Sequence, residues 1–287
     1  MFRQFPDPDM GSNLQKHCFF LALLLYLIFP QSSVLRAAAL PPDLDENPET
    51  VQRMLHDKSE LEQSLLSCEA ELKKTPENPV LLRKCAYLHY LLGWLYGEKV
   101  DKKKHFFSLL KYAKQAYYLS PENYRSFLLL TVANAKTINY LQPGDQVRMV
   151  HKLLKDTKTL LLRKHDDPDV FYLLGWLNFK VGRISSIQKF LASVLFGGLP
   201  ENLTVENGFT FLNRAETLKP DSVVYVYDLG LFYLRTNQKE QALVQFQKAQ
   251  SMKTLTLQDR IYRRKTTEQI NQLYKTLNKQ LVSALKN

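Results

Sequence analysis

Apolar residues recur three and four positions apart through most of this chain, and this spacing predicts amphipathic helices. It is clearest near the C-terminal end, where two successive helices carry Leu229, Gly230, Tyr233, Ala242, Phe246 and Ala249. The small residues let two antiparallel helices approach closely, while the large ones fill the space between them. These positions therefore predict a helical hairpin, which needs neighbours to bury its apolar surface.

The same register occurs twice more. One copy starts at Leu92-Gly93 and ends near Pro121, and another starts at Leu174-Gly175 and ends near Pro220. A degenerate copy between them has expected helices at about 122–140 and 145–163, with Ala133 at the glycine position. This is the tetratricopeptide pattern. With no run of alternating β-branched residues, the chain is predicted to be an all-α, tetratricopeptide-like solenoid of about four hairpins.

The third hairpin contains a long insertion, residues 183–206. Its first half has apolar residues at helical spacing, and Gly197-Gly198 then interrupts the pattern. We expect a short extra helix that ends in a glycine turn. Because an exposed apolar patch of this size is uncommon on a monomer, the insertion must dock on the array, cover its end, or contact a partner or a membrane. We expect it to dock on the array.

The N-terminal segment differs from the repeats. Lys16 and His17 precede a twelve-residue apolar run, and Ala37 and Ala39 have the spacing of a signal-peptidase site. Residues 1–39 therefore predict a cleaved signal peptide and an exported chain. The alternative is an uncleaved membrane anchor over about 14–35. Residues 40–50 follow as a Pro- and acid-rich linker.

The folded part is expected to extend from 51 to 256 and to begin with a helix over about 51–74. Asn78-Pro79, Ser120-Pro121 and Asp167-Pro168 each resemble a helix N-cap followed by proline in the first turn. The tail, 257–287, has apolar residues spaced for an amphipathic helix. We predict that this C-terminal helix caps the array, because repeat arrays expose apolar surface at their ends.

Charge widens the range of partners. The chain has 39 Lys and Arg against 28 Asp and Glu, for a net charge of +11. Two basic clusters stand out, and they comprise Lys102, Lys103, Lys104, Arg260, Arg263, Arg264 and Lys265. They are compatible with an acidic surface such as a tubulin-like tail or an anionic membrane. A solvated helix face is the simpler explanation of these clusters, and no motif specific to nucleic acid is present.

Aromatic residues recur at the positions of each first helix that face the concave side of such an array. The candidate partner-binding residues are Tyr87, Tyr90, Trp94, Tyr172, Trp176, Phe179, Tyr227 and Leu231. Such a ladder could hold a protein or peptide in a concave aromatic groove. Alternatively, the array curls tightly or the C-terminal helix fills the groove, and the rings are core.

No pattern of catalytic or cofactor-binding residues is recognisable. The six histidines are scattered, without the i, i+4 pair of a helical zinc site, and no phosphate-binding glycine loop is present. His165-Asp166-Asp167 belongs to an inter-repeat turn, where a helix N-cap explains it. We therefore predict no enzyme activity, no metal and no cofactor.

Two covalent features remain open. Cys68 and Cys85 are expected to face each other across an antiparallel helix pair. Packed helices lie roughly 8 to 10 Å apart, whereas bridged Cα atoms lie about 4.4 to 6.8 Å apart. Two buried thiols are therefore favoured over a disulfide. Asn202-Leu203-Thr204 is a glycosylation sequon, which matters only in a chain that passes through an endoplasmic reticulum.

Three segments carry a family resemblance: residues 171–176 (FYLLGW), 195–200 (LFGGLP) and 211–216 (FLNRAE). Over residues 171–249 the chain resembles the regulator of microtubule dynamics family and its bacterial tetratricopeptide relatives, and the apolar insertion makes the resemblance specific. The resemblance implies association with microtubules, mitochondria or membrane contact sites in animal members. The bacterial relatives are often exported, and the apparent signal peptide distinguishes this chain from cytosolic members.

The sequence as a whole favours an exported, periplasmic or secreted, non-catalytic scaffold that binds a protein or peptide partner. The alternative keeps the N-terminal segment as an anchor. In that case the repeats act in the cytosol as an adaptor on microtubules or organelles.

Overall fold

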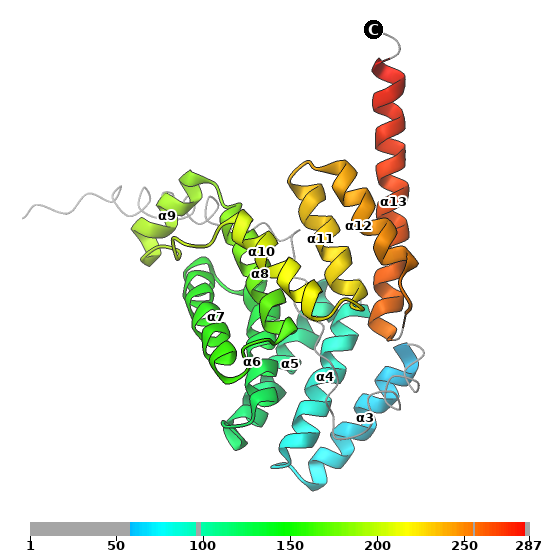
Figure 1. Cartoon of the computed structure of the whole chain (residues 1–287). Coiled ribbons are helices and arrows are strands. Elements are labelled where there is room, and N and C mark those ends of the chain that lie inside the picture. Colours follow the sequence, from blue (N-terminus) through cyan, green and yellow to red (C-terminus); the bar gives the residue numbers. More distant parts are fainter. Residues whose placement is uncertain (1–57, 96–98, 255, 285–287) are drawn as a thin grey trace, which may run out of the picture.

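The computed structural model describes residues 58–95, 99–254 and 256–284. Within these residues the chain forms eleven α-helices and one short 3-10 helix, and it has no strand. The helices stack as antiparallel pairs (Figure 1). The predicted signal peptide, linker and anchor all fall on residues outside the described part.

The four predicted hairpins are all present. They are α4 (Pro79–Leu95) with α5 (Lys99–Leu119), α6 (Tyr124–Thr137) with α7 (Pro143–Arg163), α8 (Pro168–Gly182) with α10 (Val205–Leu218), and α11 (Val223–Arg235) with α12 (Lys239–Ser251). Helix α3 (Lys58–Lys74) precedes them, and the 3-10 turn η1 (Ile138–Tyr140) follows α6. The predicted all-α repeat fold is confirmed, including the degenerate second hairpin.

Polar caps begin the helices largely where the sequence indicates. The side chain of Asn78 accepts from the backbone N–H groups of Val80 and Leu81, and that of Asp167 accepts from Asp169 and Val170. The expectation at Ser120-Pro121 is wrong by three residues. There Asn123 is the N-cap and accepts from Ser126 N–H, because Pro121 lies in the turn before the helix.

The glycines of the repeat register allow the two helices of a hairpin to approach closely. A Cβ placed on Gly93 would lie 2.5 Å from the nearest ring carbon of Phe106, and one on Gly230 would lie 2.7 Å from Phe246. Both distances are shorter than van der Waals contact. The Leu-Gly pair is therefore explained by the phenylalanine that the facing helix packs against it.

The insertion forms the predicted extra helix, α9 (Ser186–Phe196). A capping box at Ser185 begins it, and Gly197 and Gly198, with φ of 80° and 84°, end it. It docks on α7, where its Ala192 is buried and Gly198 O lies 3.0 Å from His151 Nε2. The expectation of docking is met on one side of the helix only, since the opposite side is exposed.

The C-terminal helix α13 (Leu257–Ala284) packs its first turns against α11 and α12, burying Ile261, Tyr262, Ile270 and Leu273. It therefore caps the last hairpin as predicted, and its C-terminal part continues beyond the array (Figure 1). No helix in the described ranges has an apolar stretch long enough to span a bilayer.

Candidate partner-binding site

Three lysines from three different helices surround the indole of Trp94. Their Nζ atoms lie 5.7 Å (Lys102, α5), 4.2 Å (Lys136, α6) and 4.8 Å (Lys265, α13) from the centroid of the ring. Trp94 belongs to the last turn of α4 and is 6% exposed. We call this arrangement the lysine–tryptophan cluster. It brings together positive charges from both ends of the array.

Lys136 is the buried member of the cluster. Its side chain is fully inaccessible to solvent, and its ammonium faces the rings of Tyr90 and Phe106 at 5.2 and 5.9 Å as well as that of Trp94. Aromatic faces attract cations, by about 2 kcal/mol when both groups are shielded from water. The rings therefore help to hold this ammonium in the interior.

The start of α13 is what brings Lys265 to Trp94. Thr256 and Asp259 form a reciprocal cap, in which each side chain accepts from the backbone N–H of the other at 2.9 and 3.0 Å. Gln258 Nε2 donates to Tyr90 Oη at 3.3 Å. The ring of Tyr262 lies 5.5 Å from Trp94 and 5.1 Å from Tyr227, so α13 joins the first hairpin to the last.

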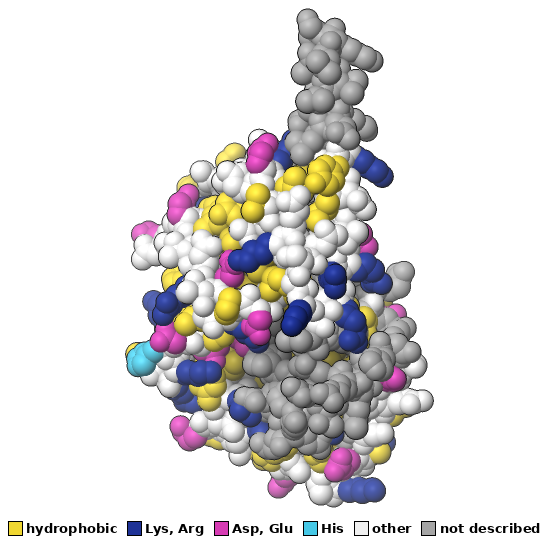
Figure 2. Space-filling model, turned by 45° about the vertical axis from the view of Figure 1, so that its right-hand side comes forward, with side chains coloured by type: hydrophobic (Ala, Val, Ile, Leu, Met, Phe, Trp, Pro, Cys, Tyr) yellow, Lys and Arg dark blue, Asp and Glu magenta, His cyan; other side chains and the backbone are white. Residues whose placement is uncertain are grey.

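The two basic clusters predicted from the sequence thus meet in space. Lys103 and Lys104 are exposed on α5 beside Lys102, and α13 exposes Arg260, Arg263 and Arg264 beside Lys265. Figure 2 shows the side of the molecule that carries α12 and α13, where Lys and Arg side chains gather. Like charges held close together attract an anion, so this surface is suited to an acidic group.

The eight candidate groove residues are not open to a partner in this structure. Seven of them are buried, and only Tyr87 is partly exposed. The α13 ring of Tyr262 covers Trp94 and Tyr227, whereas Phe232 of α11 contacts Trp176 at 4.9 Å and Phe179 at 3.7 Å between ring centroids. The ring faces are filled by neighbouring helices, which was the alternative interpretation of the ladder.

Two buried aspartates connect the third hairpin to the fourth. Asp228 of α11 accepts from the Tyr172 hydroxyl and, at 3.2 Å, from Trp176 Nε1. Asp169 of α8 accepts from the Tyr225 hydroxyl at 2.6 Å. Burial raises the pKa of Asp169 to about 7, against the opposing effects of Lys219 and the Tyr225 hydrogen bond. Sequence reasoning missed both, although a lone aspartate within the apolar run 223–232 was the available signal.

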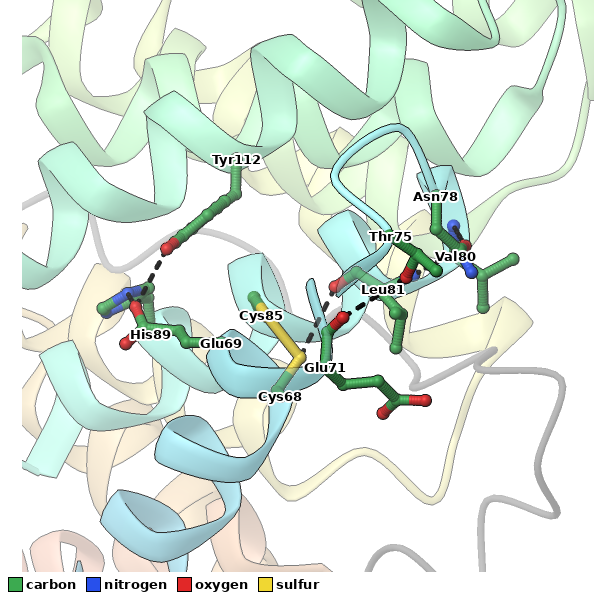
Figure 3. Close-up of a disulfide and its surroundings, with 10 residues drawn as sticks. All are labelled: Cys68, Glu69, Glu71, Thr75, Asn78, Val80, Leu81, Cys85, His89 and Tyr112. Atoms are coloured by element: carbon green, nitrogen blue, oxygen red, sulfur yellow. Dashed lines mark hydrogen bonds and ion pairs between the residues drawn. A yellow bond between two sulfur atoms is a disulfide. The ribbon is translucent and has the colours of Figure 1, made fainter. Parts of the chain in front are cut away.

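Cys68 of α3 and Cys85 of α4 form a disulfide, with Cα atoms 5.9 Å apart (Figure 3). The expectation of two free thiols is therefore wrong. The sequence argument used the separation between helix axes, but both cysteines lie on the facing sides of the two helices, where Cα atoms are closer than the axes.

His89 belongs to a polar group beside this bridge. Its Nδ1 lies 2.9 Å from His105 Nδ1, its Nε2 lies 3.5 Å from a carboxylate oxygen of Glu69, and its ring stacks on Tyr112. Tyr112 in turn donates to Glu69 at 2.9 Å. Burial and the adjacent His105 lower the pKa of His89 to about 4. The scattered histidines of the sequence thus include one spatial pair.

This group predicts a pH dependence of stability. Between about pH 6.5 and pH 4, His89 is neutral in the folded chain and protonated in the unfolded chain. The free energy of unfolding should therefore fall as the pH drops through this range. In His89→Gln this part of the pH dependence should be weaker. Urea unfolding at several pH values measures it, with His165→Gln, at an exposed position, as the control. Identical profiles for wild type and His89→Gln would contradict the assignment.

The remaining predicted positions lie in turns. Asn202 is exposed, and its backbone oxygen accepts from Asn207 Nδ2 at 3.1 Å. Asp167 is the N-cap of α8, as expected for the His165 cluster, and Asp166 pairs with Arg214 at 2.8 Å. Among the described residues no group of three His, Cys, Asp or Glu side chains could hold a metal ion.

Comparison with known proteins supports the fold and identifies a family. The family model described as Regulator of microtubule dynamics protein 1-3 matches residues 48–275. A thermophilic TPR protein from Thermus thermophilus is 17% identical, with 78% of this chain and 98% of that chain covered and a TM-score of 0.50. MamA from Desulfovibrio magneticus RS-1 is 13% identical, with 73% and 95% covered and a TM-score of 0.42. No curated protein matches the sequence.

Proposed function

The chain belongs to the regulator of microtubule dynamics family, and we propose that it is a non-catalytic helical-repeat scaffold that binds an acidic segment of a protein partner. The observation that carries the proposal is the lysine–tryptophan cluster, where Lys102, Lys136 and Lys265 lie within 5.7 Å of the Trp94 ring. Lys136 and the Trp94 ring are buried, so the cluster holds α5 and α13 together, and the exposed side chains beside it, Lys103, Lys104, Arg263 and Arg264, favour a carboxylate-rich partner.

The exposed residues around the cluster define the kind of segment that fits. Lys103 and Lys104 extend the positive surface along α5, and Arg263 and Arg264 extend it along α13. Arginine binds carboxylates in a bidentate manner, and lysine adds charge without a fixed direction. An extended chain with several Asp or Glu residues, such as a tubulin-like tail, could contact both helices at once.

Binding of a fluorescent poly-glutamate peptide, measured by anisotropy with the full chain, tests this proposal. The double variants Lys103→Glu/Lys104→Glu and Arg263→Glu/Arg264→Glu should each weaken binding about tenfold or more, because each reverses two charges at the surface. Lys155→Glu/Lys158→Glu, exposed on α7, makes the same change in net charge and should leave the affinity within about twofold of wild type.

An equal loss in all three double variants would contradict a defined site, because it would reflect net charge alone. Binding should also weaken as salt increases.

The aromatic ladder gives a second candidate site. Partner contact there requires α13 to move away from Tyr90 and Trp94. If the peptide binds the aromatic ladder, removal of residues 257–287 should increase its affinity. If the peptide binds beside the lysine–tryptophan cluster, the same deletion should lower its affinity, because Lys265 is lost.

The compartment is part of the proposal. We propose that the chain is exported, and the Cys68–Cys85 disulfide supports this, because disulfides persist in oxidising compartments. The family description names microtubules, which favours the alternative of an adaptor in the cytosol. In that alternative the N-terminal segment is kept as an anchor. The N-terminal residue of the chain from native cells separates them: Leu40 in an exported fraction supports export, whereas an intact N-terminus in a membrane fraction supports the anchor.

A further inference from the structure

The outward side of α9 carries a continuous apolar stripe. Ile187, Phe190 and Val194 are 72%, 67% and 65% exposed, and they follow one another at the i, i+3, i+7 spacing of a single helix face. Leu195, 40% exposed, borders the stripe. Isolated exposed hydrophobic residues occur elsewhere on the described surface, but here they form one patch. Such a patch marks a contact surface.

The composition of α9 is unusual for a helix that only packs on its own protein. Its eleven residues include no acidic side chain. Three of its four polar residues, Ser186, Lys189 and Ser193, share one narrow side, and the fourth, Gln188, is half-buried. Seven of its eleven residues are apolar, yet only Ala192 is buried completely, while Leu191 and Phe196 are half-buried. Folding of the described chain therefore leaves the stripe of Ile187, Phe190 and Val194 exposed to solvent.

The size of the patch argues against a second copy of the chain as its occupant. A large apolar side chain offers at most about 200 Å², so four side chains that are 40–72% exposed supply roughly 500 Å². A stable protein interface buries about 800 Å² on each partner. Entry into a lipid surface has no such minimum, because each inserted side chain contributes separately.

The surroundings of α9 are basic. Helix α7, which contacts it, exposes Arg148, Lys152, Lys155 and Lys158, and α9 itself adds Lys189. Arg148 and Lys152 pair with Asp145 and Asp156 on the same helix. Lys155, Lys158 and Lys189 add further positive charge, and anionic headgroups attract such side chains by about 1 kcal/mol each. Glu201 and Glu206 lie beyond the end of α9, after the glycine turn.

We propose that α9 is a membrane-contact helix, which lies in the surface of an anionic lipid bilayer with Ile187, Phe190 and Val194 among the acyl chains. Helix α9 lies at the periphery of the molecule beside α7 (Figure 1), and its stripe of side chains is exposed. Short amphipathic helices with Phe and aliphatic residues on one side bind lipid surfaces in this way. This contact is independent of the lysine–tryptophan cluster, which lies where α4, α5, α6 and α13 meet.

Depth-dependent quenching tests the proposal with the full chain. Phe190→Trp places an indole on the stripe, and vesicles of equal parts phosphatidylcholine and phosphatidylserine, with bromine on the acyl chains, quench only an indole that enters the bilayer. We expect Phe190→Trp to be quenched and Tyr118→Trp, at a position 84% exposed on α5, to remain unquenched. This comparison isolates α9 even where another segment binds the vesicles.

A second variant measures the contribution of the stripe. Ile187→Ser/Val194→Ser in the Phe190→Trp background should lower the quenching at a given lipid concentration about tenfold, with an unchanged melting temperature because these side chains contact solvent. The absence of quenching at Phe190→Trp, or equal quenching at both indoles, would overturn the proposal. A concentration-dependent increase in mass that the serine variant abolishes would identify a second copy as the occupant and would also overturn it.

Discussion

Reduction of the Cys68–Cys85 bridge is expected to lower the free energy of unfolding of the N-terminal end of the array by about 3 kcal/mol. The bridge joins residues 17 positions apart, and closing a loop of this length removes chain entropy from the unfolded state worth about 3 kcal/mol at room temperature. Helix α3 depends on it strongly, because α4 is its main neighbour among the described helices. Without the bridge, α3 is held by side-chain packing alone.

Hydrogen exchange of α3 and urea unfolding of the whole chain measure this effect. The oxidised wild type should show slow exchange in α3, and both the reduced wild type and Cys68→Ala/Cys85→Ala should show faster exchange there. Reductant should have no further effect on the double variant, which controls for other actions of the reagent. Recovery of Cys68 and Cys85 peptides unlinked from the non-reduced protein would contradict the bridge itself.

The helices could be predicted from the sequence because their signals are local. Apolar spacing, Asn78 and Asp167 as caps, and the glycines at 93 and 230 all act within a few residues or across one hairpin. The error at Ser120-Pro121 shows the limit of such signals, since proline is tolerated both in a turn and in the first helical turn. The third hairpin and its inserted α9 followed from spacing in the same way.

The candidate site could not be predicted as a unit. Lys102 reaches Trp94 within the first hairpin, whereas Lys265 is far away in the sequence and only the path of α13 brings it there. Lys136 had no sequence signal, because a buried lysine resembles an ordinary basic residue at the end of a helix. The aromatic ladder is buried because Tyr262 and Phe232 cover it, and both belong to helices outside the first two hairpins. Long-range packing decides these features.

The carboxylate of Asp228 is expected to matter most for the contact between the last two hairpins. Asp228→Ala should lower the free energy of unfolding by about 3 kcal/mol, because two buried donors, the Tyr172 hydroxyl and Trp176 Nε1, lose their shared acceptor. Asp228→Asn keeps one acceptor oxygen and should lose only about 1 kcal/mol. Asp221→Ala, at an exposed position in the preceding turn, is the matched control and should be neutral.

Urea unfolding followed by tryptophan fluorescence measures these differences, and one further variant separates two explanations. A buried carboxylate must be desolvated, and replacing a buried charged network by apolar side chains can be neutral or stabilising. If hydrogen bonding to Tyr172 and Trp176 outweighs desolvation, Asp228→Leu/Tyr172→Phe should still be less stable than wild type, since Trp176 Nε1 remains buried without Asp228 as acceptor. Stability equal to or above wild type in this double variant would show that the hydrogen bonds of Asp228 contribute no net stability, because its desolvation offsets them.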